Sequence, residues 1–300
     1  MSVTPSYTYT PEQVTAAFNE IKATLFRGIT AEQTPKILVV AGLQGSGKTF
    51  LLEKHLLPSK RYEKYVRLYL PEYRQKHPQY AEMIKLGVLH AYEHTQAFVE
   101  EVSEKIFTEA FTLKYNIIME CAFGRIGFAT FPPLATAAGY QFETHIVGCT
   151  QEFAHVSSIK RALKSLENRE LERFVSYADL DASMSLAQAI ILAFEVASKA
   201  VDGSQITLYE RGPGALKERL QRAHFTYSKA DIPAPTPSTA PTPNSTYANI
   251  INNHVCTPRE RDEMVKDCHL ALLKAQTYAQ LVPDVVYNDL YAYIVKYVYR

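Results

Sequence analysis

One glycine-rich stretch near the start of the chain has the residue types and the spacing to hold a nucleotide. Residues 42–49, GLQGSGKT, fit the pattern G-x-x-x-x-G-K-[ST]. The apolar run 37–40 precedes them and predicts a buried strand, and leucines at helical spacing follow over residues 51–56. In this order, glycines let successive backbone N–H groups point at phosphate oxygens, and the helix N-terminus adds partial positive charge. The stretch therefore predicts a P-loop.

The polar residues of this loop predict the contacts to the nucleotide. Lys48 would reach the β- and γ-phosphates, and the hydroxyl of Thr49 would be a ligand of Mg²⁺. The expected cofactors are therefore ATP or GTP, together with Mg²⁺. The loop residues predicted to bind them are Gly42, Gly45, Ser46, Gly47, Lys48 and Thr49.

The elements that must position this loop alternate between strand and helix patterns. Short apolar runs predict strands at 37–40, 66–70, 115–119, 141–147 and 206–209. Helical periodicity predicts helices at 11–26, 80–113, 153–171 and 186–200, and a shorter one at 127–138 that two prolines would break. Together with the P-loop, this alternation predicts an α/β fold, a P-loop nucleotide-binding domain with a mostly parallel sheet flanked by helices. Ligands then bind at the carboxyl ends of the strands.

A proline-rich stretch interrupts the pattern near the C-terminus. Residues 232–246, IPAPTPSTAPTPNST, favour an extended, semi-rigid spacer. We therefore predict a kinase-like domain at 1–230, a linker at 231–247 and a small helical segment at 248–300. The last part of that segment, VVYNDLYAYIVKYVY, could be a helix or a strand, because its Val and Tyr content also favours a strand.

Composition argues against several other classes of protein. The net charge is +1 and the basic residues are dispersed, so we expect neither a nucleic-acid nor a membrane partner. The N-terminus is polar, with no signal-peptide pattern or long apolar span, which predicts a cytoplasmic protein. The four cysteines show no C-x-x-C spacing, so a structural zinc site is not expected.

Beyond the P-loop, the sequence resembles the zeta toxin family over residues 36–215. The matching pieces are GLQGSGKTFL, YRQKHPQY, NIIMECAFGR, GYQFETHIVGC, IKRALKS, ERFVS and ITLYERG. Members of that family are P-loop kinases of toxin–antitoxin systems that phosphorylate UDP-N-acetylglucosamine and related UDP-sugars. The resemblance therefore implies a UDP-sugar acceptor and an antitoxin protein as a partner.

Three residues are candidates for binding the acceptor. Glu120 ends a predicted strand, where a carboxylate can bind a substrate hydroxyl or a metal-bound water. By resemblance, Glu104, sixteen residues earlier, contacts the sugar, and Arg125 could bind substrate or nucleotide phosphates. The simpler alternatives are a surface glutamate at a strand end and a solvated acidic helix face.

Further arginines match family positions near the transferred phosphate. Phosphoryl transfer spreads negative charge over equatorial oxygens, which guanidinium groups stabilise with fork geometry. By resemblance, Arg161 and Arg173 are the two arginines of the lid region, although Arg169 competes for either role. Arg211, after the last predicted strand, would flank the adenine or the phosphates. Solvated helix residues are the simpler alternative for these arginines.

The catalytic base of the family has no direct counterpart here. That base is an aspartate in a D-x-D stretch, and counting back from His77 places Tyr69 and Pro71 at the two aspartate positions. Glu72 is one residue out of register and is our predicted base. Otherwise Glu120 or Glu104 serves, or no base is used.

Three hypotheses about function follow. The first is an active kinase of the zeta type with Glu72 as base. The second is a P-loop kinase for another acceptor, such as a nucleoside, a nucleotide or another small metabolite. The third is a non-catalytic relative that binds nucleotide and acts through partners. In addition, residues 250–300 could dock on the kinase body and modulate its site, or serve as an independent module or a stabilising appendage.

Overall fold

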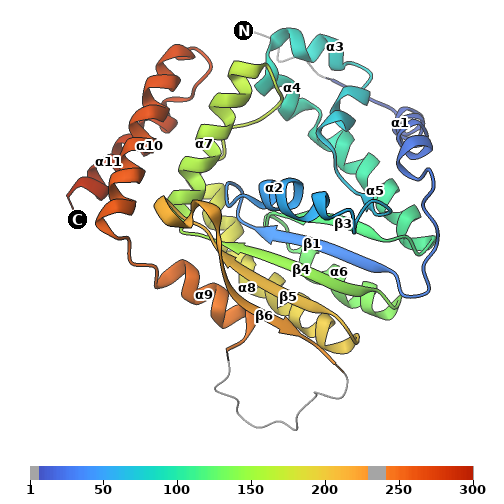
Figure 1. Cartoon of the computed structure of the whole chain (residues 1–300). Helices are drawn as coiled ribbons and strands as arrows, with labels where there is room; N and C mark the ends of the chain where they lie inside the picture. Colours follow the sequence, from blue (N-terminus) through green and yellow to red (C-terminus); the bar gives the residue numbers. More distant parts are fainter. Residues whose placement is uncertain (1–6, 229–240, 300) are drawn as a thin grey trace.

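The computed structural model describes residues 7–228 and 241–299, and a six-stranded sheet in the order β2-β3-β1-β4-β5-β6 forms its centre (Figure 1). The strands are β1 (Lys36–Gly42), β2 (Val66–Arg67), β3 (Ile117–Cys121), β4 (Gln141–Gly148), β5 (Gln205–Glu210) and β6 (Leu220–Thr226). The first five are parallel, and β6 pairs with β5 in the antiparallel sense. The predicted α/β fold with a mostly parallel sheet is confirmed.

Strand β1 lies between β3 and β4, so the strand order reverses on either side of it. Its side chains pack in two directions. Leu38 and Val40 lie in a small core with Leu52 of the helix that follows the P-loop. Ile37 and Val39 belong to the larger core. A switch point of this kind opens a crevice at the carboxyl end of the central strand, and the P-loop starts there.

Helices cover both faces of the sheet. The main ones are α1 (Pro11–Leu25), α4 (Val88–His94), α5 (Gln96–Thr112), α6 (Gly127–Ala137), α7 (Gln151–Asn168) and α8 (Tyr177–Ala200). The P-loop helix α2 (Lys48–Leu51) continues as a π-helix over Leu52–Leu56 and a 3₁₀ turn over Leu57–Ser59. Shorter elements are the 3₁₀ helices Pro71–Lys76, Ile84–Leu86 and Gly214–Glu218 and the helix α3 (Tyr80–Met83).

Three predicted elements differ from those observed, and one strand was not predicted. Strand β2 is shorter than predicted, since a 3₁₀ helix starts at Pro71. The single helix predicted over 80–113 is interrupted at Gly87, whose φ of 114° ends one segment before α4 begins. Helix α6 is continuous through both internal prolines, and it packs along α8. Strand β6 was not predicted, because its mostly exposed residues lack the apolar pattern of a buried strand.

The C-terminal segment is helical and packs directly on the rest of the chain. It consists of α9 (Pro243–Asn252), α10 (Pro258–Thr277) and α11 (Asp284–Val298), so its last part is a helix and not a strand. Helix α9 begins inside the range predicted as a linker, of which residues 231–240 lie outside the described residues. Buried residues of all three helices belong to the same core as the sheet: Tyr247, Ile250, Met264, Cys268 and Leu290.

Helix α8 is long and apolar enough to cross a membrane by length and composition alone. Its buried side includes Ile190, Ile191 and Phe194. The helix contacts α6, α7, α9 and strands β4 and β5. These contacts are those of a helix that covers one face of the sheet (Figure 1).

Candidate functional site

The P-loop joins β1 to α2 and is held against two other parts of the chain. Gly42, Gly45 and Gly47 all have positive φ, at 147°, 86° and 94°. A Cβ at Gly45 would lie 1.9 Å from the backbone oxygen of Ala154 at the start of α7, and one at Gly47 would lie 2.7 Å from a guanidinium nitrogen of Arg211. The loop path therefore requires glycine at both positions.

A cavity of about 340 Å³ lies over this loop. Its lining residues are Gln44, Gly45, Gly47, Lys48, Thr49, Phe50, Ser157, Arg161 and Arg211. Among the predicted nucleotide-binding residues, Gly42 and the buried Ser46 lie just behind this surface, where a Cβ on Gly42 would meet the Ser46 hydroxyl at 2.7 Å. The structure thus brings most of the predicted P-loop contacts to one cavity.

Lys48 is buried and directed back onto its own loop. Its Nζ donates a hydrogen bond of 2.9 Å to the backbone oxygen of Leu43. Burial lowers the pKa of Lys48, and the nearby Glu120 carboxylate partly offsets this effect. Arg161 acts in the same direction as burial, which shows that this guanidinium lies within electrostatic range of the lysine.

Thr49 and Glu120 form the pair expected of a Mg²⁺ site. The Thr49 hydroxyl donates a hydrogen bond of 2.9 Å to Glu120 Oε2. Glu120 lies on β3 opposite Val40 of β1, and this parallel register brings its carboxylate to the P-loop. A hydroxyl and a carboxylate side by side are the hard oxygen ligands that Mg²⁺ uses in phosphotransferases.

Arg67, at the end of β2, is a site residue that the sequence analysis missed. Its Nη2 lies 3.1 Å from Glu120 Oε1 and 3.2 Å from Glu53 Oε1. It holds the other oxygen of the carboxylate that Thr49 contacts. Its position two residues before Tyr69, the first expected aspartate position, was the signal that could have identified it.

Arg161 and Arg173 lie in different environments. Arg161, on α7, lines the P-loop cavity, and its Nε is 2.6 Å from Oε2 of the buried Glu172. Arg173 is exposed, and its backbone N–H donates to Glu172 Oε1 at 3.2 Å. Arg169 ends α7 in the left-handed region. Of the three, Arg161 is the one that lines this cavity in the described parts of the chain.

Arg211 follows β5 and connects the loop to α7. Its Nη1 donates to the backbone oxygen of Gly45 at 3.3 Å, and its guanidinium lies 5.1 Å from the centre of the Phe153 ring. Burial lowers the pKa of Arg211. The side chain therefore supports the P-loop and also faces the cavity.

A second polar cluster occupies the place where the family has its aspartates. Tyr69 accepts a hydrogen bond of 3.2 Å from Nε of Arg74, a side chain that is only 1% exposed. The Arg74 guanidinium stacks 3.8 Å from the centre of the Tyr92 ring and donates to Thr95 Oγ1 at 2.9 Å and Gln96 Oε1 at 2.6 Å. None of these partners is a carboxylate. We call Tyr69, Arg74, Gln96, Glu100 and Arg125 the acceptor-side cluster.

This cluster continues from Arg74 to Arg125. Gln96 donates to Glu100, which in turn forms an ion pair with Arg125. Burial raises the pKa of the Tyr69 phenol, and the Arg74 guanidinium partly opposes this effect.

Glu72 and Glu104 lie outside both groups of contacts. Glu72 is exposed on the 3₁₀ helix Pro71–Lys76. Glu104 lines a groove of about 540 Å³ between α1 and α5, together with Thr15 and Phe18. One turn earlier on α5, Glu100 is the glutamate that pairs with Arg125. The roles predicted for Glu72 and Glu104 stay predictions.

Comparisons with known proteins place this arrangement in a family. The family described as zeta toxin matches residues 22–216. Toxin PezT of Streptococcus pneumoniae is 23% identical and toxin zeta of Streptococcus pyogenes is 22% identical, each over 158 residues. These matches span 51% of this chain and only 60% and 53% of the two relatives.

Solved structures from at least two systems have the same fold. One comes from the PezAT chromosomal toxin–antitoxin system of Streptococcus pneumoniae, with a TM-score of 0.61, 14% identity, and coverage of 91% of this chain and 98% of that one. Another is the native complex AvrRxo1-ORF1:-ORF2, with a TM-score of 0.57, 11% identity, and coverage of 96% and 86%. A third, the same complex with ATP, has a TM-score of 0.50, 11% identity, and coverage of 94% and 86%. With the family match covering more than half of its length, the chain belongs to the zeta toxin family.

Proposed function

We propose that this chain transfers the γ-phosphoryl group of ATP or GTP to a hydroxyl of a small acceptor. The observation that carries the proposal is the grouping of Lys48, the Thr49–Glu120 pair and Arg161 around one cavity over the P-loop. These are a phosphate-binding ammonium, a Mg²⁺-binding oxygen pair and a guanidinium for transition-state charge. The nucleotide and Mg²⁺ are part of the proposal, and a solved relative bound to ATP supports it.

Family membership favours a UDP-sugar of the UDP-N-acetylglucosamine type as the acceptor. The acceptor-side cluster supports a site for an anionic, hydroxyl-bearing molecule. Arg125 is 61% exposed while paired with Glu100, so it can contact a ligand without leaving its partner. Arg67 adds a second positive charge beside Glu120. Arg125 and Arg67 are the side chains that we propose to contact the diphosphate of a UDP-sugar.

The base that activates the acceptor hydroxyl is assigned to Glu72 or to Glu120. The phenol of Tyr69 is not assigned this role, because a tyrosine with its ordinary pKa of about 10 is protonated at neutral pH. Glu72 is the glutamate next to the two vacant aspartate positions, whereas Glu120 already lies at the cavity through Thr49. A base must lie within about 3 Å of the proton it accepts, or reach it through one water.

The acceptor-side cluster also supports a second candidate function. Where the family has a D-x-D stretch, this chain has Tyr69 and Pro71 and directs Tyr69 at a buried arginine. A different acceptor, such as a nucleotide or another phosphorylated metabolite, would fit a site that has exchanged carboxylates for cationic and phenolic groups. A nucleotide-binding relative that acts through partners is the remaining alternative.

A protein partner belongs to the same proposal. Structural relatives come from a toxin–antitoxin system, which supports an antitoxin as the partner and a cytoplasmic location. The C-terminal helices do not supply a cover for the site. Among the described residues, the lining of the P-loop cavity comes from the loop, α7 and Arg211, and none of it from α9, α10 or α11. An effect of these helices would pass through α7, which α10 and α11 contact, or through β5, which α9 contacts.

The decisive experiment is nucleotide consumption by the purified chain with Mg²⁺ and a panel of acceptors. The panel contains UDP-sugars, nucleosides, nucleotides and simple sugar phosphates, and each product is identified by mass spectrometry. The expected result is acceptor-dependent conversion of ATP to ADP with a phosphorylated UDP-sugar. A phosphorylated product from another class would establish the second candidate. Tight ATP binding with no acceptor-dependent consumption across the panel would overturn both.

A further inference from the structure

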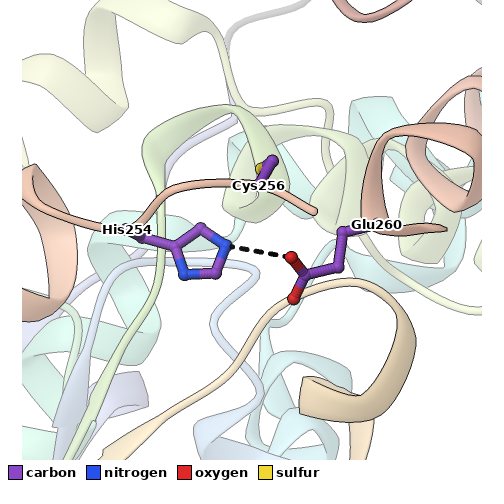
Figure 2. A group of neighbouring side chains, drawn as sticks. All are labelled: His254, Cys256 and Glu260. Carbon is purple, nitrogen blue, oxygen red and sulfur yellow. Dashed lines mark ion pairs between the residues drawn. The ribbon is translucent and has the colours of Figure 1, made fainter. Parts of the chain in front are cut away.

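A cluster of metal-binding residues lies away from the P-loop cavity, in the connection between α9 and α10. His254 and Cys256 are on that connection, and Glu260 is in the first turn of α10 (Figure 2). They offer one nitrogen, one sulfur and one oxygen atom, all within 4.8 Å of one another. This combination of donors suits zinc and similar transition metals, whereas Mg²⁺ and Ca²⁺ prefer oxygen ligands alone.

Glu210 hydrogen-bonds the ring nitrogen of His254 that is not directed at the cluster. Nδ1 of His254 lies 2.8 Å from Glu210 Oε1, at the end of β5, and donates its hydrogen to that carboxylate. Arg222 pairs with the same glutamate. A carboxylate behind a histidine is the arrangement that fixes the tautomer and orientation of metal-binding histidines in proteins.

The other nitrogen of His254 is directed at the cluster and has no hydrogen-bond partner in the described parts of the chain. That atom, Nε2, is buried, and the ion-pair contact to Glu260 Oε2, dashed in Figure 2, is 3.6 Å long, which is too long for a hydrogen bond. A buried ring nitrogen that carries a lone pair costs free energy unless a partner satisfies it. A metal ion would be such a partner.

Glu260 is positioned independently of any metal. Its Oε2 accepts hydrogen bonds from the backbone N–H of Thr257 at 2.8 Å and from the Thr257 hydroxyl at 3.0 Å, which completes the capping box of α10. This capping role explains the presence of the glutamate. It explains neither the unpartnered nitrogen of His254 nor the thiol beside it.

We propose that His254, Cys256 and Glu260 form a binding site for a zinc-like divalent transition metal, with Glu210 supporting the histidine and a fourth position open to a water or another ligand. Zinc bonds of about 2.0–2.3 Å place neighbouring ligand atoms about 3.5 Å apart in a tetrahedral site. Side-chain rotations that move each of the three donor atoms by roughly 1 Å would therefore bring them all within bonding distance of the ion.

The metal would fasten the C-terminal helices to the nucleotide-binding end of the sheet. Glu210 is followed directly by Arg211, whose guanidinium contacts Gly45 of the P-loop. The cavity next to the cluster, about 560 Å³, is lined by residues of β5, β6, α9 and α10. The site thus joins the α9–α10 connection to the end of β5. Metal binding at this site does not depend on the proposed kinase activity.

Cobalt titration of the full chain tests this proposal. The chain, free of any histidine tag, is reduced, stripped with a chelator and titrated with Co²⁺, a spectroscopic substitute for zinc. We expect one Co²⁺ per chain, a sulfur-to-cobalt charge-transfer absorption, and displacement by Zn²⁺. In Cys256→Ser the charge-transfer absorption is lost. In Glu260→Gln, which keeps the capping box, affinity falls at least tenfold, and in Glu210→Gln it falls about 10–100-fold.

His269→Gln is the matched control, because His269 is exposed on the same helix and lies outside the cluster. It is expected to bind Co²⁺ like the wild type. A second measurement avoids variants that could fail to fold. Cys256 is half-buried while the other three cysteines are buried, so a thiol reagent should modify Cys256 first, and stoichiometric Zn²⁺ should protect it.

Two results would overturn the proposal. One is the absence of saturable one-to-one binding together with no protection of Cys256 by Zn²⁺. The other is unchanged cobalt affinity and spectrum in Cys256→Ser and Glu260→Gln.

Discussion

The two sides of the site are built on different principles. At the P-loop, the arrangement depends on the backbone path and on a few charges. These are glycines at positive φ, a buried Lys48 and the Thr49–Glu120 pair. On the acceptor side, a buried Arg74 donates hydrogen bonds to side chains that carry no formal charge. The first arrangement keeps what phosphate binding requires, and the second departs from the family pattern at the positions of the family aspartates.

This difference shows which side of the chemistry tolerates change. Phosphoryl transfer depends mainly on positioning and on electrostatic stabilisation of the nucleotide, and a general base adds about 10²–10⁴-fold. A chain can therefore lose the family aspartates and still hold the nucleotide for transfer. Variants on the two sides should accordingly affect different kinetic constants.

The largest effect is expected at the P-loop. Lys48→Ala should lower phosphoryl transfer by about 10³-fold, or below detection, because the ammonium that meets the β- and γ-phosphates is lost. Lys54→Ala, an exposed lysine on the same helical segment, is the matched control and should leave the rate unchanged. Circular dichroism confirms the fold of both. Turnover at the wild-type rate in Lys48→Ala would contradict the proposal that this chain is a P-loop kinase.

The next effect separates the two candidate bases. If Glu72 is the base, Glu72→Gln should slow transfer by about 10²-fold or more with little change in ATP affinity. Glu120→Gln should also slow it, but through weaker Mg²⁺ binding, so that added Mg²⁺ restores part of the rate. Rates are measured across a range of Mg²⁺ concentrations. A fast Glu72→Gln beside an inactive Glu120→Gln that Mg²⁺ does not rescue assigns the base to Glu120.

The third comparison sets Arg161 against Arg173. Arg161→Ala should reduce kcat by about 10²-fold, since its guanidinium lines the P-loop cavity. It should also lower thermal stability, because the buried Glu172 loses its 2.6 Å partner. Arg161→Lys restores the charge without the fork geometry and separates the two effects. Arg173→Ala should change kcat by only a few-fold, and equal losses in both variants would require Arg173 to move to the cavity during turnover.

A smaller effect is expected on the acceptor side. Tyr69→Phe removes the oxygen that accepts from Arg74 and leaves a buried donor unpaired, at a cost of about 1–3 kcal/mol of stability. The KM for the acceptor should rise several-fold while the KM for ATP stays constant. Steady-state kinetics with each substrate varied in turn gives both values. An equal change in both KM values would show that the two sides are not separable.

The sequence was most informative where a residue type is required by the backbone. The P-loop, four of the five parallel strands and α1 could be predicted closely, because apolar periodicity and a glycine pattern encode them locally. Strand β6 could not, since its exposed edge position needs no apolar pattern. The acceptor-side cluster was also out of reach, because Arg74 and Gln96 meet only through the packing of a 3₁₀ helix against α5. The packing of the C-terminal helices on the core depends in the same way on contacts far apart in sequence.

The smallest effect concerns the contact between α7, the helix that carries Arg161, and α11. His155 of α7 is buried, with Nε2 donating to the backbone oxygen of Val175 at 2.9 Å and Nδ1 accepting from the Tyr293 hydroxyl of α11 at 2.7 Å. Burial lowers the pKa of His155, an effect that Asp289 partly opposes. Its neutral form therefore stabilises the fold fully above the unfolded-state pKa of about 6.5. That contribution is lost as the pH falls through the lower folded-state pKa, because the unfolded chain then binds the extra proton.

The unfolding temperature should drop by a few degrees below pH 6.5, and His155→Gln should show a flatter profile. His269→Gln, at an exposed site, should keep the wild-type profile. If the unfolding temperatures of His155→Gln and the wild type fall in parallel as the pH is lowered, the contact between α7 and α11 does not depend on this proton.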